Sequence, residues 1–308
     1  MNITAVVTAY NVKSHIENVV KAMPLFVNNI IVVDDKCPQE TGSFIEELNL
    51  EKVIVIFHKY NQGVGGAVVT GYKKALELNS DIVVKVDGDG QMNPANISKL
   101  IQPIIDNKAD YTKGNRFVDL KALKQMPKVR LFGNSVLSFL VKVSSGYWDI
   151  MDPTNGFTAI SKDTILGLEL EKLSKRFFFE SDMLINLNIQ NCVVKDVSFS
   201  AKYEDEESSL SVTKVLFDFP SKLFKGLLKR IFYKYYIYDF NMASIYMLLG
   251  FPLFMFGIIF GSVSWYSSFT TGVLASTGSI MIAVLPIILG VQFLLQAISI
   301  DIENLPEK

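Results

Sequence analysis

Apolar and polar positions alternate along the first 115 residues in a pattern that predicts strands separated by helices. Short apolar runs with the length of buried strands occupy residues 3–9, 30–35, 52–57 and 81–87. Between and after them, helical spacing of apolar residues occupies residues 14–23, 43–48, 64–78 and 95–105. Strands that alternate with single helices form βαβ units, so we expect an α/β fold with a mostly parallel sheet sandwiched by helices. Ligands bind such sheets beyond the carboxyl ends of the strands.

The C-terminal part of the chain has a different pattern, because residues 240–300 contain no charged residue and no histidine. A helix needs about 20 apolar residues to cross a bilayer, so this stretch predicts two transmembrane helices, Met242 to Tyr266 and Ser279 to Ile300. Pro252 and Pro286 are tolerated in such helices. A buried hairpin of a soluble protein is the alternative, but soluble helices of this length usually carry charge on an exposed face.

A basic segment precedes the first predicted span. Its cations, interleaved with leucine and phenylalanine, are Lys214, Lys222, Lys225, Lys229, Arg230 and Lys234. The pattern predicts a pair of interfacial amphipathic helices that bind anionic lipid headgroups, and a solvated basic surface helix is the alternative. The positive-inside rule then places residues 1–240 in the cytoplasm, and two spans return Asp301 to Lys308 to the same side. We therefore expect a multi-pass protein of the cell (inner or plasma) membrane.

These patterns divide the chain into four parts. They are an α/β domain (1–210), basic juxtamembrane helices (211–240), a transmembrane hairpin (241–301) and a short tail (302–308). The acidic stretch Tyr203 to Ser209 links the first two parts. Gly257 and Gly261, at GxxxG spacing, offer a contact through which spans could associate into a homo-oligomer.

Composition narrows the classes of function. The net charge of -1 lacks the basic excess of a nucleic-acid-binding domain, so we expect no nucleic-acid partner. Cys37 and Cys192 are the only cysteines and lie outside any CxxC pattern, which argues against a disulfide scaffold and a zinc site. His15 and His58 likewise have no neighbours at metal-ligand spacing.

The sharpest chemical motif is VVKVDGDGQ, residues 83–91, in which a buried strand ends in two carboxylates. Alternate residues leaving a strand point the same way, so Asp87 and Asp89 can converge on one Mg²⁺ or Mn²⁺ ion, with diphosphate oxygens in the remaining coordination positions. Gln91 would add an oxygen or a hydrogen bond to phosphate. The alternative is an ordinary Asp-Gly turn. The glycine-rich residues 61–71 lack GxGxxG spacing, so NAD binding is not expected.

Several ordered motifs together carry a family resemblance. TAYN (8–11), VVDD (32–35), NQGVGGAVVTG (61–71) and VDGDGQ (86–91) make residues 1–240 resemble the inverting family-2 glycosyltransferases of GT-A fold. The resemblance implies that a nucleotide-sugar donor is bound by Thr8, Ala9, Tyr10, Asn11, Asp34, Asp35, Lys59, Gly63, Asp87 and Gly88, and a metal ion by Asp87, Asp89 and Gln91. Thr8 and Ala9 depart from the family's usual proline turn, and Val12 stands where glutamate is common.

GNRF (114–117) and KVRLFGNS (128–135), together with the predicted spans, look like the polyprenyl-phosphate sugar synthases, the dolichol-phosphate mannose synthase group. The resemblance implies transfer of a hexose from a UDP- or GDP-sugar to undecaprenyl or dolichyl phosphate with inversion. Arg116, Arg130 and Ser135 would bind the acceptor phosphate, and Asp152 would line the sugar site. A phosphate dianion is already nucleophilic, so Asp89, Arg116 and Arg130 would act by charge stabilisation and positioning.

Two other functions stay open at this stage. A family-2 enzyme that glycosylates a hydroxyl of a lipid-linked glycan needs a base, and RFFFESDML supplies Glu180 and Asp182, of which Asp182 is the candidate. The same acids could simply occupy the positive end of a helix. A noncatalytic, nucleotide-sugar-binding membrane scaffold is the third interpretation, and the intact VDGDGQ motif argues against it.

Overall fold

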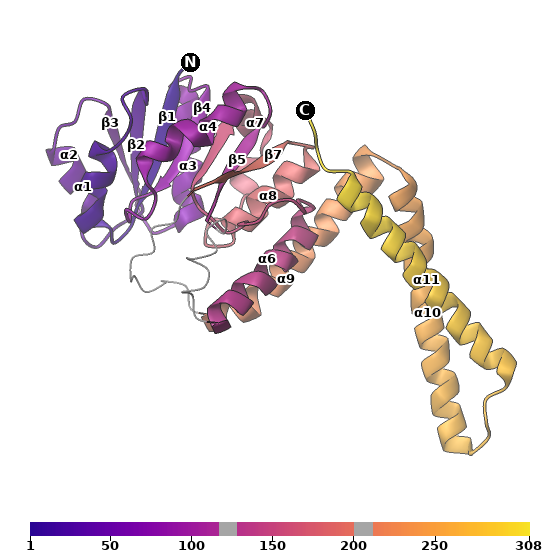
Figure 1. Ribbon diagram of the computed structural model, residues 1–308. Coiled ribbons are helices and arrows are strands. Elements are labelled where there is room, and N and C mark those ends of the chain that lie inside the picture. Colours follow the sequence, from indigo (N-terminus) through magenta and orange to yellow (C-terminus); the bar gives the residue numbers. More distant parts are fainter. Residues whose placement is uncertain (117–127, 200–211) are drawn as a thin grey trace. The chain divides into compact units, whose positions relative to one another are not determined.

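A computed structural model describes residues 1–116, 128–199 and 212–308, without the side chains of 128–132, 134 and 212–218. The chain divides into two units, residues 1–230 with 306–308, and residues 231–305. The first unit contains the predicted α/β domain (1–210), and its described strands form one seven-stranded sheet (Figure 1). The acidic linker 203–209 lies outside the described residues.

The strands and helices up to residue 105 follow the predicted order with ends shifted by at most two residues, whereas the bounds of the strand at 111–115 were not predicted. The strands are β1 (Ile3–Ala9), β2 (Asn29–Asp34), β3 (Val53–Phe57), β4 (Ile82–Asp87) and β5 (Tyr111–Asn115), and the helices are α1 (Lys13–Lys21), α2 (Thr41–Glu47), α3 (Val64–Glu77) and α4 (Ile97–Ile105). Further elements follow, namely α6 (Lys128–Ser145), β6 (Thr158–Ser161), α7 (Lys162–Gly167), α8 (Phe179–Ile189), β7 (Val194–Ser198) and α9 (Val212–Phe232). The predicted α/β fold is confirmed.

The strand order β3-β2-β1-β4-β6-β5-β7 contains one reversed strand. β6 pairs antiparallel with both β4 and β5, whereas the other neighbours in the sheet run parallel. β4 and β5 therefore run in the same direction, so their carboxyl ends lie at the edge of the sheet where β6 begins. This edge brings together the residues after Asp87, the residues after Asn115 and the loop before Thr158.

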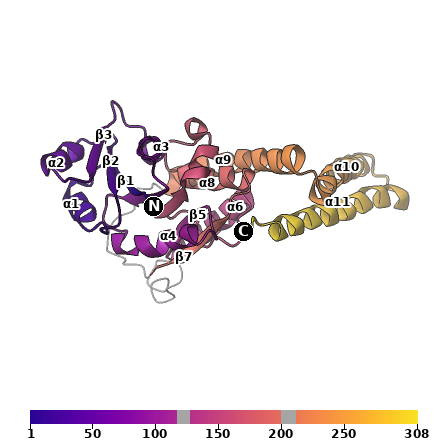
Figure 2. The same cartoon turned by 90° about the horizontal axis from the view of Figure 1, so that it is seen from above.

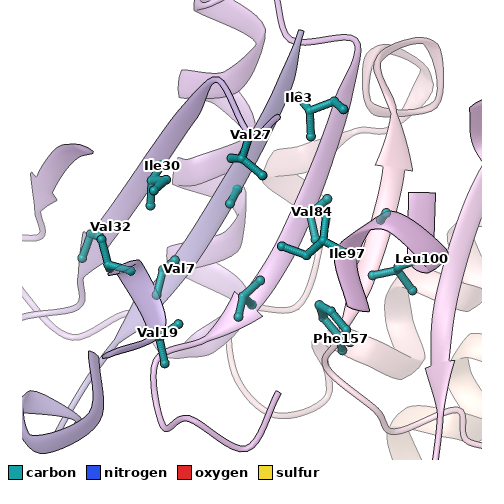
Figure 3. Packing of buried hydrophobic residues seen from close by; sticks show 14 of the residues in the cluster. Ile3, Val7, Val19, Val27, Ile30, Val32, Val84, Ile97, Leu100 and Phe157 are labelled. Carbon is teal, nitrogen blue, oxygen red and sulfur yellow. The ribbon is translucent and has the colours of Figure 1, made fainter. Parts of the chain in front are cut away.

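Helices cover both faces of the sheet. One face packs Val7, Val32 and Val84 against α1 and α4 in a buried apolar cluster (Figure 3). On the other face α3 approaches so closely that a Cβ on Gly71 would lie 2.2 Å from Cγ1 of Val6. Figure 2 shows α3 and α8 on one side of the sheet and α1 and α4 on the other. The apolar alternation of the strands is what allows both layers to pack.

The basic segment forms one helix, α9, that runs into a π-helical segment, Tyr233–Tyr238, and not the predicted pair of α-helices. Arg230 does not face lipid headgroups as expected. It is 2% exposed, and its guanidinium donates hydrogen bonds to the carbonyls of Ser144 (3.0 Å) and Val143 (3.1 Å). These carbonyls belong to the last turn of α6, where no following helical N–H group can bind them. The buried guanidinium binds them instead, and their partial negative charge stabilises the cation.

The second unit contains two helices long and apolar enough to cross a membrane, α10 (Met242–Thr271) and α11 (Thr277–Glu303). They form a hairpin in which small residues allow close approach, because a Cβ on Gly257 would lie 2.6 Å from Ile287 and one on Gly290 would lie 2.6 Å from the backbone nitrogen of Phe254. Gly261 faces Ala283 of the same hairpin. The GxxxG pair therefore packs within the chain, and the homo-oligomer stays a prediction.

Replacing Gly290 by alanine tests this packing. We expect Gly290→Ala to destabilise the hairpin by about 1–3 kcal/mol, because the added methyl group meets the backbone of α10 and forces the helices apart. Gly278→Ala is the matched control, since its Cβ would meet nothing closer than Ser276 Oγ at 3.7 Å. Thermal unfolding of both variants in detergent, followed by circular dichroism, measures the difference, and equal melting temperatures would contradict the proposed close contact.

Candidate active site

The turn after β4 presents the two predicted metal-binding carboxylates. Thr8 lies opposite Asp87 in the sheet, and its hydroxyl donates to Asp87 Oδ1 at 3.0 Å. The backbone of Gly88 donates to Thr8 O, and a Cβ at Gly88 would lie only 2.8 Å from that oxygen. Asp89 Oδ1 accepts from the backbone of Gln91 at 3.0 Å. Close packing against β1 and this short turn therefore fix both aspartates at the carboxyl edge of the sheet.

A row of polar side chains crosses the sheet directly behind this turn. Lys85 on β4 and Lys113 on β5 both pair with Thr158 on β6, so the three side chains share one face of the sheet. All three are at most 1% exposed. Lys85 Nζ lies 2.9 Å from Asp87 Oδ1 and 3.0 Å from the carbonyl of Gly156, to which it donates. Lys113 donates to the carbonyl of Asn155.

Glu180 at the start of α8 joins the two lysines. Its Oε1 lies 3.1 Å from Lys85 Nζ, and its Oε2 accepts from Lys113 Nζ at 3.2 Å. Burial lowers the pKa of Lys85, but the carboxylates of Asp87 and Glu180 outweigh that effect and hold the pKa above the ordinary lysine value. The lysine is therefore a permanent buried cation beside the first aspartate of the motif.

The loop before β6 closes over this pair. A Cβ on Gly156 would lie 2.4 Å from Lys85 Nζ and 2.6 Å from Asp87 Oδ2, so a side chain at this position would displace both groups. Gly156 belongs to the same loop as Asp152, which is predicted to line the sugar site, and its neighbours include Asp87, which is predicted to bind the donor and the metal ion. Two parts of the predicted site thus meet at one glycine.

The acidic pair after β2 organises loops. Asp34 accepts from the backbone of Cys37 (2.7 Å) and Gly42 (2.6 Å), at the start of α2. Asp35 accepts from the backbone of Gln62 (2.8 Å) and Gly63 (2.7 Å), and its Oδ1 lies 2.7 Å from His58 Nδ1. Both carboxylates are buried and bind the backbone, so they shape the loops around the predicted donor site.

The remaining predicted donor residues lie on the same loops. Ala9 is buried opposite Asp34 in the sheet, whereas Tyr10 and Lys59 are exposed. Asn11 has a positive φ of 55° and Gly63 one of 85°, and at Gly63 a Cβ would lie 2.7 Å from the carbonyl of Lys175. These turns direct the loops across the carboxyl edge of the sheet, as the α/β architecture predicts.

Arg116, the first residue after β5, is held by Asp152. The guanidinium makes two parallel contacts, Nε to Oδ2 at 2.7 Å and Nη2 to Oδ1 at 3.2 Å, the bidentate geometry that arginine prefers with carboxylates. Asp152 is fully buried, whereas 41% of the Arg116 side chain is exposed. A buried carboxylate thus fixes a part-exposed guanidinium at the same edge of the sheet as Asp87.

Asp196 on β7 lies behind this ion pair. Its Oδ2 accepts from Met151 N at 2.7 Å and from Asn115 Nδ2 at 3.1 Å. Burial, with a further contribution from the neighbouring charge of Asp152, raises the pKa of Asp196 to about 6. The acid therefore holds both the end of β5 and the loop that carries Asp152.

The other predicted acceptor residues lie on α6. Ser135 is exposed, and the side chain of Arg130 is outside the described part of the structure, although its backbone belongs to the first turn of the helix. The predicted base Asp182 accepts from Ser174 N (2.8 Å) and Asn186 Nδ2 (3.1 Å). Of the two acids in the ESD sequence, Glu180 is the one that reaches the lysines beside Asp87.

The structure adds site residues that sequence reasoning missed. They are Lys85, Lys113 and Gly156, together with His58, which was set aside but joins Asp35 to Thr70 Oγ1. A signal for the lysines existed, because each stands two residues before the polar end of a strand, at a position where a buried strand normally has an apolar side chain. Nothing in the sequence pattern indicated that both would meet Glu180.

The carboxylate oxygens at the turn are suitable ligands for a hard divalent cation. Asp87 and Asp89 offer carboxylate oxygens on part-exposed side chains, which is the ligand type that Mg²⁺ and Mn²⁺ prefer. Among the described residues, no group of three or more His, Cys, Asp and Glu side chains could hold a metal ion. The two aspartates would therefore need oxygens from water and from a bound diphosphate to complete a coordination sphere.

Comparisons with known proteins agree with this architecture. The sequence profile described as Glycosyl transferase family 2 matches residues 4–166. A UDP-N-acetylglucosamine–dolichyl-phosphate N-acetylglucosaminyltransferase from Methanococcus voltae is 36% identical over 238 residues, covering 72% of this chain and 93% of that protein. A dolichol-phosphate mannosyltransferase from Pyrococcus furiosus is 28% identical over 186 residues, covering 58% of this chain and 52% of that protein.

Solved structures share the fold. Glucosyl-3-phosphoglycerate synthase from Mycobacterium tuberculosis, in complex with Mn²⁺, uridine diphosphate and glucosyl-3-phosphoglycerate, superposes with a TM-score of 0.55. Its sequence is 17% identical, and the likeness covers 74% of this chain and 79% of that one. At this identity the likeness establishes the fold alone.

The raised pKa of Asp196 leads to a pH-dependent prediction. Ionising this buried acid destabilises the folded chain. The destabilisation is absent below the pKa that Asp196 has in the unfolded chain, near 4, and it is complete once the pH has risen through its pKa in the folded chain, about 6. We therefore expect Asp196→Asn to raise the melting temperature at pH 7.5, with the gain shrinking towards pH 4. Thermal unfolding of both proteins across this range provides the measurement. A gain that is independent of pH would contradict the raised pKa.

Proposed function

Because this chain belongs to glycosyl transferase family 2 and is a glycosyltransferase, we propose that it moves a sugar from a nucleotide donor to the phosphate of a membrane polyprenol. The donor is a UDP- or GDP-activated hexose or N-acetylhexosamine, and the anomeric configuration is inverted. The acceptor is a polyprenyl phosphate of the dolichyl or undecaprenyl type. UDP-N-acetylglucosamine is the donor to test first, because the Methanococcus voltae relative is named for it.

The observation that carries this proposal is the placement of Arg116. β4 and β5 end at the same edge of the sheet, which supports placing the guanidinium and the Asp87–Asp89 turn in one site. Asp152 presents the guanidinium in a fixed orientation while leaving much of it exposed. Guanidinium groups bind phosphate oxygens in the same bidentate manner as they bind carboxylates, so this position suits an acceptor phosphate next to the donor diphosphate.

The chemistry follows from these positions. A phosphate oxygen of the lipid attacks the anomeric carbon in line with the bond to the nucleoside diphosphate, which leaves as the new sugar–phosphate bond forms. Arg116, with Arg130 and Ser135 on α6, would hold the attacking phosphate and reduce the entropy cost of the encounter. A divalent cation at Asp87 and Asp89 would supply positive charge for the departing diphosphate. The lipid phosphate is the nucleophile, so no side chain is needed as a base.

The contacts of Asp182 are consistent with this acceptor. Its carboxylate binds the backbone nitrogen of Ser174 and the side chain of Asn186, and so ties the first turn of α8 to the preceding loop. We propose that Asp182 stabilises this turn and does not act as a base. Transfer to a glycan hydroxyl would require a side chain that acts as a base, and Asp182 is engaged in these structural contacts instead.

The helices outside the sheet favour a lipid acceptor. α10 and α11 are long and apolar enough to span a bilayer. On α9, Leu223 packs inward and Gly226 approaches Ile185 of α8, while Phe224, Leu228 and Phe232 are each at least half exposed. Their spacing of four residues places them on one side of the helix, beside exposed Lys225 and Lys229. We propose that this side of α9 lies in the headgroup region of the cytoplasmic leaflet.

The first test concerns Asp89. The purified chain is incubated with Mn²⁺, a polyprenyl phosphate and radiolabelled UDP-N-acetylglucosamine or other UDP- and GDP-sugars, and label in the organic extract is counted. We expect extractable product from the wild type and a loss of at least about 10³-fold for Asp89→Ala, because charge on the leaving diphosphate is no longer balanced. Full activity of the variant would remove the proposed role of the turn.

A second test separates the two acceptor classes. We expect Arg116→Ala to lower kcat/KM for the lipid about 10²- to 10³-fold, and Arg116→Lys to fall between it and the wild type, because lysine keeps the charge but loses the planar fork. Asp182→Asn should change the rate less than about threefold, as expected for a residue outside the chemistry. The reverse ranking, with Asp182→Asn inactive and Arg116→Ala active, would favour a hydroxyl acceptor.

A further inference from the structure

A chain of four charged side chains lies behind the Asp87–Asp89 turn. It consists of Lys85, Lys113, Glu180 and Asp87, whose contacts join them in the order Lys113–Glu180–Lys85–Asp87. The two ammonium groups and two carboxylates balance. Lys85 and Lys113 are at most 1% exposed, whereas 27% of the Asp87 side chain reaches solvent. Asp87 is therefore the point at which the buried group meets the site.

A purely structural role does not account for these lysines. Burying an ion pair costs desolvation energy that apolar side chains of similar volume avoid, so a sheet interior gains little stability from it. The neighbouring positions of β4, Val83, Val84 and Val86, follow the apolar rule. Lys85 departs from this rule within β4, and its ammonium group contacts Asp87.

The contacts of Asp87 are asymmetric. Thr8 Oγ1 and Lys85 Nζ both contact Oδ1, whereas Oδ2 faces Gly156, where a Cβ would lie 2.6 Å away. A divalent ion bound by Asp87 would therefore share this carboxylate with the ammonium group of Lys85, in a region that is shielded only partly by water. The two cations repel each other there, which lowers the affinity of the site for the metal.

We propose that Lys85 is the resident counter-cation of Asp87 and sets how tightly the site holds a divalent cation, and that Glu180 is the positioning residue that holds Lys85 in place. The proposal rests on the proposed function in one respect, that the turn binds a metal ion. Its consequence is that the empty protein holds the cation weakly, and that the negative charge of the donor diphosphate is needed for firm binding. Cation and donor would then bind and leave together.

Removing each charge should change the affinity in opposite directions. Lys85→Met deletes the repelling cation and leaves Glu180 paired with Lys113, so divalent affinity should rise. Glu180→Gln removes the carboxylate that both ammonium groups share, so the uncompensated positive charge beside Asp87 grows and affinity should fall. In Lys113→Met, Glu180 pairs with Lys85 alone and neutralises more of its positive charge, so divalent affinity should rise as well. A network that merely supports the fold would lower the affinity in every variant.

The experiment is a Mn²⁺ titration of the full-length chain in detergent without donor, with free Mn²⁺ measured by electron paramagnetic resonance. We expect binding to tighten about fivefold or more in Lys85→Met and to weaken by a similar factor in Glu180→Gln. Lys74→Met and Glu77→Gln are matched controls, because they break an exposed ion pair of 2.9 Å on α3 and should leave binding unchanged. Melting temperatures establish that each variant is folded, and Lys113→Met replaces Lys85→Met if that chain fails to fold.

Two results would overturn the inference. They are weaker binding in both Lys85→Met and Glu180→Gln, or no change in either. The lipid assay separates these results from the proposed function. Product formation by a wild type whose variants do not shift in opposite directions would reject the inference alone. Opposite shifts without any lipid-linked product would reject the acceptor assignment and leave the inference standing.

Discussion

Two ammonium groups buried in the interior of a sheet must be neutralised, and this requirement ties the separate parts of the site together. The carboxylate that meets both is Glu180, which comes from α8 and thereby fixes the helix against the sheet. The lysines also bind the carbonyls of Asn155 and Gly156, so the loop before β6 is held by the same charges. Strand, helix and loop are positioned by one electrostatic balance, since none of these groups can leave without exposing an uncompensated charge.

The reversed strand β6 makes that balance possible. By pairing antiparallel with β4 and β5, it places Thr158 between Lys85 and Lys113 and starts at the edge where both neighbours end. The loop from Asp152 to Phe157 therefore arrives next to the Asp87–Asp89 turn and to Arg116. In a uniformly parallel sheet that loop would lie at the opposite edge, and the ion pair between Arg116 and Asp152 could not form beside the Asp87–Asp89 turn.

The sequence predicted much of the fold because its information there is local. Strands β1 to β4 and their helices follow from apolar periodicity, and Asp87 and Asp89 from their spacing at the end of a strand. The insertion of β6 could not be predicted, because strand order depends on contacts between residues far apart in the chain. For the same reason the sequence could not predict that Lys85 meets Glu180 and Gly156, which lie 95 and 71 positions away in the chain. Arg230 was misjudged because a basic amphipathic pattern does not reveal which cation caps a neighbouring helix.

Gly156 has a consequence for how this site can change over generations. It belongs to the loop that carries Asp152, but Lys85 and Asp87 occupy the space that a side chain would need. A mutation at position 156 is therefore limited by these two residues, and a change at Lys85 alters which side chains position 156 can accept. The loop before β6 and the Asp87–Asp89 turn cannot change independently, so variation among related chains is expected first in the other loops at this edge of the sheet.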